Sequence, residues 1–315
     1  MMTYTPALKE IFYFIGVTTT QSSIMKVFPA WAEYLGLGDV VIKGIDFEPH
    51  SDPAAYREAV SFIKNDPLSR GALVTTHKLD LYDASKDLFE VIDPHATAMA
   101  ETSCISKRGD KLICHAKDPI SSGLTIDGFL ENNHFENTSG DLFCMGAGGS
   151  TIAMTWHLQQ KYRGKNRPER IVVSDISQER LNHIRDFHET LKTDINIEYV
   201  LVRTPEDNDI ILHGLPEGSM IVNATGLGKD APGSPLTNDA QFPQNAVVWE
   251  LNYRGDLIFL YQAKSQKQNR SLQIEDGWNY FIYGWTQVIA EVFDIDIPTS
   301  GPEFDAISDI ARNIK

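Results

Sequence analysis

Hydrophobic and polar positions follow two different periods along the first 125 residues. Short apolar runs, typical of buried strands, are followed by stretches whose apolar residues recur every three or four positions, as on one face of a helix. The expected strands are residues 11–17, 40–47 and 71–75, and the expected helices are residues 27–37 and 52–64. Strands that alternate with helices are typical of an α/β sheet with parallel pairs.

A sharper alternation begins near residue 141, after a connecting helix expected at 123–138 and a polar break. The expected strands are 141–145, 170–174, 199–202, 220–224 and 247–251, and the helices between the first three are 150–162 and 177–193. Two further helices are expected at 278–292 and 304–313. This β–α–β–α–β run predicts one mononucleotide-binding half of a Rossmann fold, with extensions.

The charge balance limits the classes of partner. The 315 residues include 28 lysines and arginines and 43 aspartates and glutamates, so the formal charge is −15. Such an acidic chain is repelled by phosphate backbones, which argues against a nucleic-acid partner. Apolar residues make up 42% of the chain, as in soluble globular proteins. No apolar run reaches the roughly 18 residues that span a membrane, so we expect no membrane partner.

The cysteines and the N-terminal sequence indicate the cellular compartment of the protein. Cys104, Cys114 and Cys144 are widely spaced and form neither a Cys-x-x-Cys pair nor a zinc-binding pattern, so we expect reduced thiols and no metal site. The N-terminus lacks the basic and then apolar order of a signal peptide. These features favour a cytoplasmic protein.

A glycine-rich turn joins the first strand and the first helix of the second unit. It consists of Gly146, Ala147, Gly148 and Gly149. Glycines allow a tight turn and let backbone N–H groups approach a pyrophosphate at the N-terminus of a helix. The strand–loop–helix–strand order favours a dinucleotide site over an ordinary loop, although Thr151 occupies the third fingerprint position, where glycine or alanine is usual.

A carboxylate follows the next expected strand. Asp175 stands where a side chain can accept hydrogen bonds from both ribose hydroxyls of NAD, and its charge would repel the 2′-phosphate of NADP. No lysine or arginine comes immediately after it. The same aspartate could instead cap the next helix. If the domain binds a dinucleotide, Asp175 predicts NAD as the preferred cofactor over NADP.

The order of motifs along nearly the whole chain resembles that of the shikimate/quinate dehydrogenase family. The matching segments, in the family's order, are Gly16 to Ser23, Val74 to Lys78, Ala116 to Asp118, Gly146 to Gly149, Asn223 to Thr225, Glu250 to Tyr253, and Asp276–Gly277. The resemblance implies a two-domain α/β fold. Residues 121–277 would form the Rossmann-type NAD-binding domain, and residues 1–120 with the C-terminal helices in 278–315 would form the substrate-binding domain.

The resemblance also implies the site residues. Lys78 and Asp118 match the catalytic lysine and aspartate, and two assignments stay open: Lys78 takes the proton while Asp118 orients it, or Asp118 handles the proton while Lys78 stabilises the alkoxide. His77 and His115 flank this pair, as structural residues or as proton relays. The expected substrate contacts are Ser22, Ser23, Thr75, Ser103 and Tyr253. The expected cofactor contacts are the glycine turn, Asp175, Ala224, Thr225 and Gly277.

Several positions depart from the family's pattern. Ile24 stands where a second serine of the N-terminal loop is usual, and the lysine segment is one residue short and lacks its usual Asn and Pro. Ser103 replaces an asparagine, and Gly284 replaces a glutamine of the last helices. A pocket that loses polar partners rejects ligands whose groups it leaves unpaired. We therefore expect a related cyclic or polyhydroxylated alcohol or hydroxy acid rather than shikimate itself.

These features together predict an NAD-dependent dehydrogenase that interconverts a secondary alcohol and a ketone on a small-molecule polyol or hydroxy acid. Two alternatives stay open. One is a non-catalytic homologue that keeps the fold and senses a metabolite, and the other is an enzyme that uses the same substrate site for non-redox chemistry. A homodimer is compatible with the resemblance, because dimers are common in such families, although the sequence contains no recognisable self-complementary patch.

Overall fold

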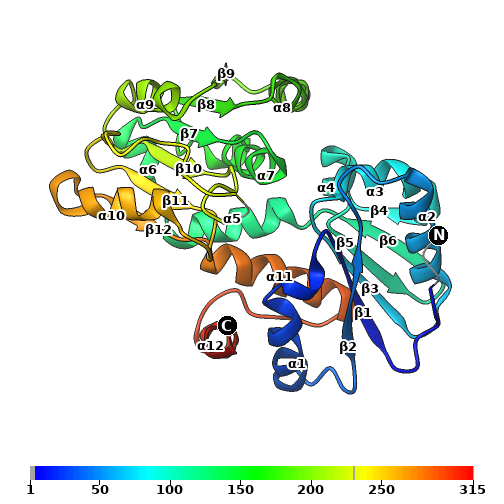
Figure 1. Ribbon diagram of the computed structural model, residues 1–315. Coiled ribbons are helices and arrows are strands. Elements are labelled where there is room, and N and C mark those ends of the chain that lie inside the picture. The colour runs from blue at the N-terminus through cyan, green and yellow to red at the C-terminus, as the bar shows by residue number, and fades with distance from the viewer. Residues whose placement is uncertain (1–3, 230, 315) are drawn as a thin grey trace. The chain divides into compact units, whose positions relative to one another are not determined.

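The computed structural model describes residues 4–229 and 231–314. The chain divides into two compact units, one made of Met1–Lys117 with Ile282–Lys315 and the other of Asp118–Phe281. The chain passes between them after Lys117 and again within helix α11 (Trp278–Phe293), a few residues from the limits expected at 120 and 278. Each unit is built around its own sheet (Figure 1).

The first unit contains a mixed sheet with the strand order β2-β1-β3-β5-β6-β4 in the described residues. Its strands are β1 Ile11–Gly16, β2 Val41–Asp46, β3 Ser69–Val74, β4 Val91–Ile92, β5 Cys104–Arg108 and β6 Lys111–His115. Its helices are α1 Ile24–Tyr34, α2 Pro53–Asn65, α3 Lys78–Ser85, α4 Pro94–Met99 and α12 Pro302–Ile314, with short 3-10 turns η1 Thr19–Gln21 and η2 Lys86–Leu88.

Strand β1 lies between β2 and β3, parallel to both, and all six of its residues are buried. The expectation of parallel pairs holds for these strands. Strands β5 and β6 were not predicted, and β5 runs antiparallel to β3 and β6. The physical reason is the tight turn at Gly109, which has a φ of +59° and joins β5 directly to β6 as a hairpin. A parallel pair would need a longer crossover connection.

The second unit contains a wholly parallel sheet with the order β12-β11-β10-β7-β8-β9 in the described residues. Its strands are β7 Leu142–Met145, β8 Arg170–Asp175, β9 Asn196–Leu201, β10 Met220–Asn223, β11 Val247–Glu250 and β12 Gln273–Glu275. Its helices are α5 Asp118–Phe129, α6 His134–Thr138, α7 Gly149–Leu158, α8 Gln178–Leu191, α9 Pro205–His213 and α10 Ile258–Arg270, with the 3-10 turn η3 Lys161–Arg163.

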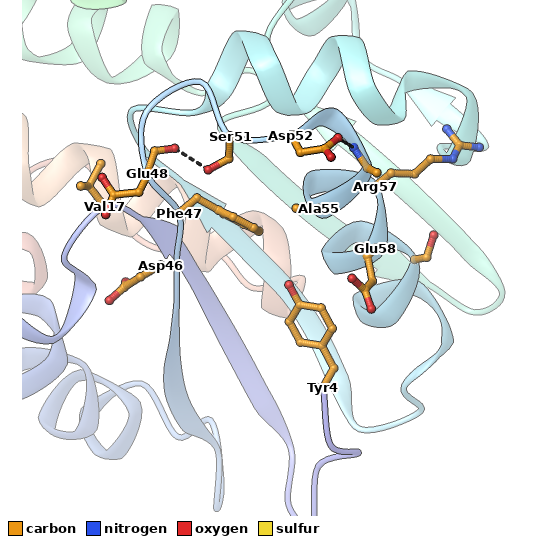
Figure 2. A pocket seen from close by; sticks show the side chains of 12 residues that line it. Tyr4, Val17, Asp46, Phe47, Glu48, Ser51, Asp52, Ala55, Arg57 and Glu58 are labelled. Atoms are coloured by element: carbon orange, nitrogen blue, oxygen red, sulfur yellow. Dashed lines mark hydrogen bonds between the residues drawn. The ribbon is translucent and has the colours of Figure 1, made fainter. Parts of the chain in front are cut away.

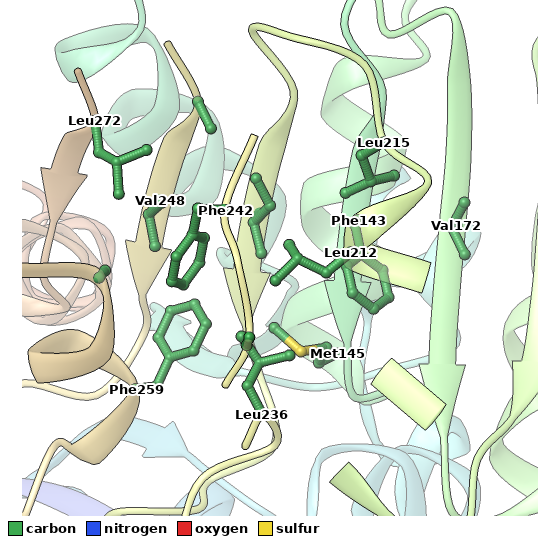
Figure 3. Close-up of a cluster of buried hydrophobic side chains, with 14 residues drawn as sticks. Phe143, Met145, Val172, Leu212, Leu215, Leu236, Phe242, Val248, Phe259 and Leu272 are labelled. Carbon is green, nitrogen blue, oxygen red and sulfur yellow. The ribbon is translucent and has the colours of Figure 1, made fainter. Parts of the chain in front are cut away.

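An apolar cluster fixes α9 and α10 on one face of this sheet (Figure 3). Phe242 and Phe259 pack edge to face there, with ring centroids 5.9 Å apart. Val248 of β11 belongs to this cluster, whereas the next residue, Trp249, contacts Phe129 of α5. Successive strand residues point to opposite faces, so α5 lies on the other side of the sheet. The predicted α/β fold with a Rossmann-type domain is confirmed.

The helix expected at 123–138 was placed wrongly. The structure has α5, which begins at Asp118, and the separate short helix α6, which lies inside the expected polar break. Helix α5 begins early because Pro119 is compatible with the first turn of a helix, where a missing N–H costs nothing. Helix α10 was not expected, because only Phe259, Leu260 and Ala263 are buried along it and the apolar period is weak.

Across residues 4–229 and 231–314, the helices all lack the combination of length and apolar content that crossing a membrane requires.

Two aromatic residues of α10 offer a matched test of the core. The Phe259 side chain is 1% exposed within the apolar cluster, whereas Tyr261, two positions on, is 63% exposed. We expect Phe259→Ala to lower the free energy of unfolding by about 3–5 kcal/mol, because it leaves a cavity. Tyr261→Ala should change it by less than about 1 kcal/mol. Urea unfolding of both variants checks this, and equal losses would contradict the assigned packing.

Candidate functional site

The glycine turn after β7 is held by close backbone contacts. Gly146 has a φ of +101°, and a Cβ placed on it would lie 2.7 Å from the carbonyl oxygen of Ala224. Its N–H donates to the Ser174 carbonyl at 2.7 Å. By contrast, a Cβ placed on Gly148 would meet no described atom within 4 Å. Gly146 is therefore needed for packing within the fold, whereas Gly148 leaves open space at the start of α7.

Thr151, the departure from the fingerprint, closes this turn. Its hydroxyl donates to the Gly146 carbonyl at 2.6 Å, and the side chain is fully buried. The hydroxyl thus satisfies a buried backbone oxygen.

The carboxylate of Asp175 connects the ends of two neighbouring strands. One oxygen accepts the Ala147 N–H at 2.8 Å, and the other accepts the Ser177 N–H at 2.8 Å. The side chain is nearly buried, with 6% of the residue exposed. Each carboxylate oxygen can accept a second hydrogen bond, so these contacts leave capacity for a ligand hydroxyl.

Ile176, directly after this carboxylate, is 80% exposed. We did not predict it as a site residue, although an isoleucine in a strand-to-helix turn is itself an unusual signal. The exposed Ile176 side chain offers an apolar surface for a flat ring. The neighbouring Asp175 carboxylate offers acceptors for hydroxyl groups.

The loop after β10 contains the expected residues Ala224 and Thr225. The Ala224 N–H donates to the Met145 carbonyl at 2.8 Å, which fixes this loop beside the glycine turn. The Thr225 hydroxyl donates to Asn223 Oδ1 at 2.7 Å and accepts the Leu227 N–H at 3.1 Å. The glycine turn, Asp175 and the β10 loop are thus brought together along the carboxyl ends of three adjacent parallel strands, where α/β sheets bind ligands.

Gly277 and Tyr253 occupy the segments around β11 and α11. A Cβ on Gly277 would lie 2.0 Å from the Leu251 carbonyl oxygen, so the glycine is required by this backbone contact. The Tyr253 ring lies 4.5 Å from that of Phe281 and 6.1 Å from that of Trp278. The predicted contacts of Gly277 and Tyr253 with a ligand stay predictions beside these packing roles.

A buried glutamate in this region was missed as a site residue. Glu250, the last residue of β11, is fully buried, and burial raises the pKa of its carboxyl to about 7, against hydrogen bonds from Asn252 and Asn223 that lower it. The available signal was a single carboxylate at the end of the apolar run Val247–Trp249. A strongly perturbed carboxyl at a strand end is a candidate for a functional role.

In the first unit, the segment that carries Lys78 is a tight turn. Thr76 has a φ of +31°, a strained conformation for a β-branched residue, and the His77 N–H donates to the Thr75 carbonyl. Lys78 follows as the first residue of α3 and is half-buried.

The ring of His77 anchors this turn. It is fully buried, and its Nδ1 lies 2.9 Å from the hydroxyl of Tyr56 on α2. Burial lowers the pKa of His77. The Tyr56 oxygen in turn accepts the Ser51 N–H at 3.2 Å. These contacts hold the ring through Nδ1, and the choice between a structural role and a proton relay for His77 stays open.

The predicted serine and threonine contacts differ in exposure. Ser22 and Ser23, between η1 and α1, and Thr75, after β3, are partly exposed. Thr75 donates its hydroxyl to the Ile15 carbonyl at 3.3 Å. Ser103 is only 2% exposed, and its Oγ accepts the Lys117 N–H at 2.7 Å. The structure therefore gives Ser103 an internal partner, and its contact with a substrate stays a prediction.

Asp118 and Lys78 both begin helices. Asp118 is half-buried at the start of α5, where a negative charge interacts favourably with the helix dipole. The two residues belong to different units, Lys78 to the first and Asp118 to the second. Beside Asp118, the Lys117 ammonium pairs with Glu291 at 2.6 Å, and this glutamate also lies 3.6 Å from His115.

A separate cavity of about 1010 Å³ lies within the first unit (Figure 2). It is lined by Asp46, Glu48, Asp52, Glu58 and Arg57, among others, and the Tyr4 and Phe47 rings turn toward α2 beside it. The predicted catalytic and substrate-binding residues are not among the residues that line this cavity.

The fold and the glycine turn define a class of protein: two α/β units, of which the second has a Rossmann-type dinucleotide-binding fold. No family model matches the sequence. The chain is 24% identical over 196 residues to a shikimate dehydrogenase (NADP(+)) of Streptococcus gordonii, over 61% of this chain and 62% of that enzyme. The match thus spans less than two thirds of the length of this curated relative.

Solved structures match almost the whole chain. The crystal structure of shikimate dehydrogenase from Aquifex aeolicus superposes with a TM-score of 0.71, covering 98% of this chain and 99% of that chain at 16% identity. The structure of 5-ketofructose reductase from a Gluconobacter strain gives a TM-score of 0.66, with 98% and 99% coverage at 16% identity. The structures share the fold, and with the sequence match they confirm the predicted resemblance to the shikimate dehydrogenase family.

The two glycines of the turn should respond differently to a methyl group. We expect Gly146→Ala to lower the free energy of unfolding by about 2–4 kcal/mol, because the Cβ would clash with the Ala224 carbonyl and φ is positive. Gly148→Ala should be nearly neutral, because its φ is −85° and the space beside it is open. Thermal and urea unfolding measure both, and a stable Gly146→Ala variant would contradict the described turn.

Proposed function

We propose that the protein is an NAD-dependent oxidoreductase that interconverts a secondary alcohol and a ketone on a shikimate- or quinate-like cyclic or polyhydroxylated substrate. The observation that carries the proposal is the Asp175 carboxylate, held by the Ala147 and Ser177 amides beside the glycine turn that opens α7. The likeness in sequence and fold to shikimate dehydrogenases supports the reaction class.

The residues of the second unit fit a dinucleotide. The open space at Gly148 would admit a pyrophosphate to the N-terminal amides of α7, and the Asp175 oxygens retain capacity for ribose hydroxyls. When bound, the nicotinamide supplies the acceptor for a hydride. Ala224, Thr225 and Gly277 are the proposed contacts near that ring.

The preference for NAD rests on charge. The Streptococcus gordonii relative is named for NADP(+), whereas this chain has the carboxylate of Asp175 followed by the apolar Ile176. A 2′-phosphate beside a nearly buried carboxylate would bring two negative charges together with no cation from the next residue. The exposed Ile176 side chain would cover one face of an adenine ring.

We assign proton transfer and substrate orientation to Lys78 and Asp118. Oxidation of an alcohol requires that a proton leave the oxygen as the hydride leaves the carbon, so a group close to the hydroxyl must accept that proton. The strained turn at Thr76 and the buried His77 ring hold the Lys78 backbone in one position. The proposed substrate contacts are Ser22, Ser23, Thr75, Tyr253 and the buried Ser103.

The substrate class follows from the altered polar shell. Ser103 is shorter than the asparagine of the family pattern and already has a backbone partner, and Gly284 offers no side chain. The first change replaces an amide by a shorter hydroxyl and the second removes the side chain altogether, which disfavours shikimate itself. A reductase of 5-ketofructose has the same fold, which supports a polyol or a related hydroxy acid as the substrate.

Turnover tests the reaction. We expect NADH formation from NAD with at least one member of a panel of shikimate, quinate and other cyclic and linear polyols and hydroxy acids. Lys78→Ala should lower kcat by about 10²–10⁴-fold, because it removes the acid/base or the alkoxide partner. Lys86→Ala, at an exposed lysine in the 3-10 turn η2 that follows the same helix, serves as the matched control and should leave the rate unchanged. A panel without turnover, together with retained NAD binding, would favour a metabolite sensor.

Cofactor choice tests Asp175 separately. We expect wild type to bind NADH at least about tenfold more tightly than NADPH, and Asp175→Asn to reduce this ratio by about tenfold, because the repulsive charge is lost. Fluorescence titration gives the dissociation constants, and thermal unfolding shows whether the variant is folded. Wild type that binds NADPH as tightly as NADH would refute the assignment of Asp175.

A further inference from the structure

Glu250 connects the two loops that follow β10 and β11. One carboxylate oxygen accepts a hydrogen bond from Asn223 Nδ2 at 2.8 Å, and the other accepts the Asn252 N–H at 2.8 Å. All three residues are buried, with Glu250 at 0% exposure. We call Asn223, Glu250 and Asn252 the Glu250 cluster. Both neighbours of the carboxylate are donors, so the arrangement suits the ionised form, which only accepts.

The Glu250 cluster extends into both loops. Asn223 Oδ1 accepts the N–H and the hydroxyl of Thr225, at 3.1 and 2.7 Å. Asn252 Nδ2 donates to the Leu227 carbonyl at 3.1 Å, which joins the loop after β11 back to the loop after β10. The carboxylate therefore helps to fix the conformation of both loops, and not only the position of one side chain.

Backbone contacts bring these loops still closer. The Leu257 N–H donates to the Gly228 carbonyl at 3.3 Å. A Cβ placed on Gly255 would lie 2.1 Å from the same carbonyl oxygen, so only glycine allows this approach. The loop that contains Ala224 and Thr225 is thus fixed from one side by the β11 loop and from the other by the glycine turn at Gly146.

The charge of Glu250 is poorly solvated in this position. Burial raises the pKa of its carboxyl, while the amides of Asn223 and Asn252 and the ammonium of Lys229 lower it, and the result is about 7. A protonated carboxyl would direct a hydrogen toward surroundings that already donate, and would weaken at least one of the two contacts. The cluster can therefore exist in two states with different hydrogen bonding near neutral pH.

We propose that Glu250 is a positioning residue whose ionised carboxylate fixes the loops at 223–228 and 252–257 in the arrangement that binds the dinucleotide. The proposal rests on the proposed dinucleotide site, which includes Ala224 and Thr225. The proposal has a measurable thermodynamic consequence. If the protein with an ionised Glu250 binds the dinucleotide more tightly, binding must release protons from Glu250. A residue with a merely structural role would not release one.

The test measures NADH binding and proton release with the full chain. As the pH rises from 6 to 8, Glu250 ionises, so the dissociation constant for NADH should fall by about fivefold, which is the larger part of the tenfold limit set by a one-unit difference in pKa between the free and bound forms. Calorimetry at pH 7 in buffers of different ionisation enthalpy should report net proton release. Glu250→Gln should abolish both the pH dependence and the proton release.

Glu275 provides the matched control. It ends the neighbouring strand β12, and burial raises the pKa of its carboxyl as well, but it lies outside the Glu250 cluster. Glu275→Gln should retain the pH dependence of wild type. Asn252→Ala keeps the carboxylate but removes the contact with Leu227, so it should reduce the pH dependence. This variant decides the question if thermal unfolding shows that Glu250→Gln does not fold.

The outcomes distinguish a failure of the proposed function from a failure of the role assigned to Glu250. Wild type that binds NADH at no pH would refute the proposed function. Wild type that binds NADH, with a pH dependence and proton release that persist in Glu250→Gln, would overturn the role of Glu250 and leave the proposed function intact.

Discussion

The close approach of two backbones at Gly146 is the constraint on which the second unit depends. The loop after β7 passes the Ala224 carbonyl at a distance that leaves no room for a side chain, and the same glycine donates its N–H to the end of β8. Three strand ends are thus held together by main-chain contacts that few substitutions can relax. Two polar side chains beside these ends, Thr151 of α7 and Asp175 of β8, satisfy a carbonyl and an amide that this crowding buries.

The residues at these strand ends combine internal and proposed external roles. Each carboxylate oxygen of Asp175 accepts one hydrogen bond from the protein backbone. Position 277 must be glycine because the Leu251 carbonyl leaves no room for a Cβ. A side chain that is already fixed by the fold needs little further ordering when a ligand arrives, so preorganisation lowers the entropic cost of binding. The same logic applies to Lys78, whose backbone is fixed by the strained turn at Thr76 and the buried ring of His77.

Local patterns predicted the parts of the structure that are determined locally. The alternation of apolar runs with helical periods gave the strands and helices around the glycine turn, because parallel strands buried on both faces have continuous apolar sequences. It missed the hairpin of β5 and β6, whose direction depends on a turn at Gly109, and it missed α10, which buries only a narrow stripe. Neither feature has a strong signature at the level of hydrophobic period.

The site was harder to predict than the fold. The motifs located Asp175 and the glycine turn at the ends of adjacent strands, as expected. The sequence could not show that the Ser103 hydroxyl accepts a hydrogen bond from the Lys117 N–H. Nor could it show that the Glu250 carboxylate lies between two donors, because these contacts join segments that are distant in sequence. Burial and partner geometry, rather than residue type, distinguish a carboxylate with a perturbed pKa from an ordinary one.

The path of the chain between the two units has a consequence for biosynthesis. The second unit is continuous in sequence, whereas the first is completed only by the residues after Phe281. Trp31 of α1 is fully buried and donates its indole N–H to the Ile307 carbonyl of α12 at 2.9 Å. During translation, Trp31 leaves the ribosome well before its partner Ile307 is synthesised. The nascent first unit therefore has an incompletely covered apolar face at a stage when the whole sequence of the second unit has already been synthesised.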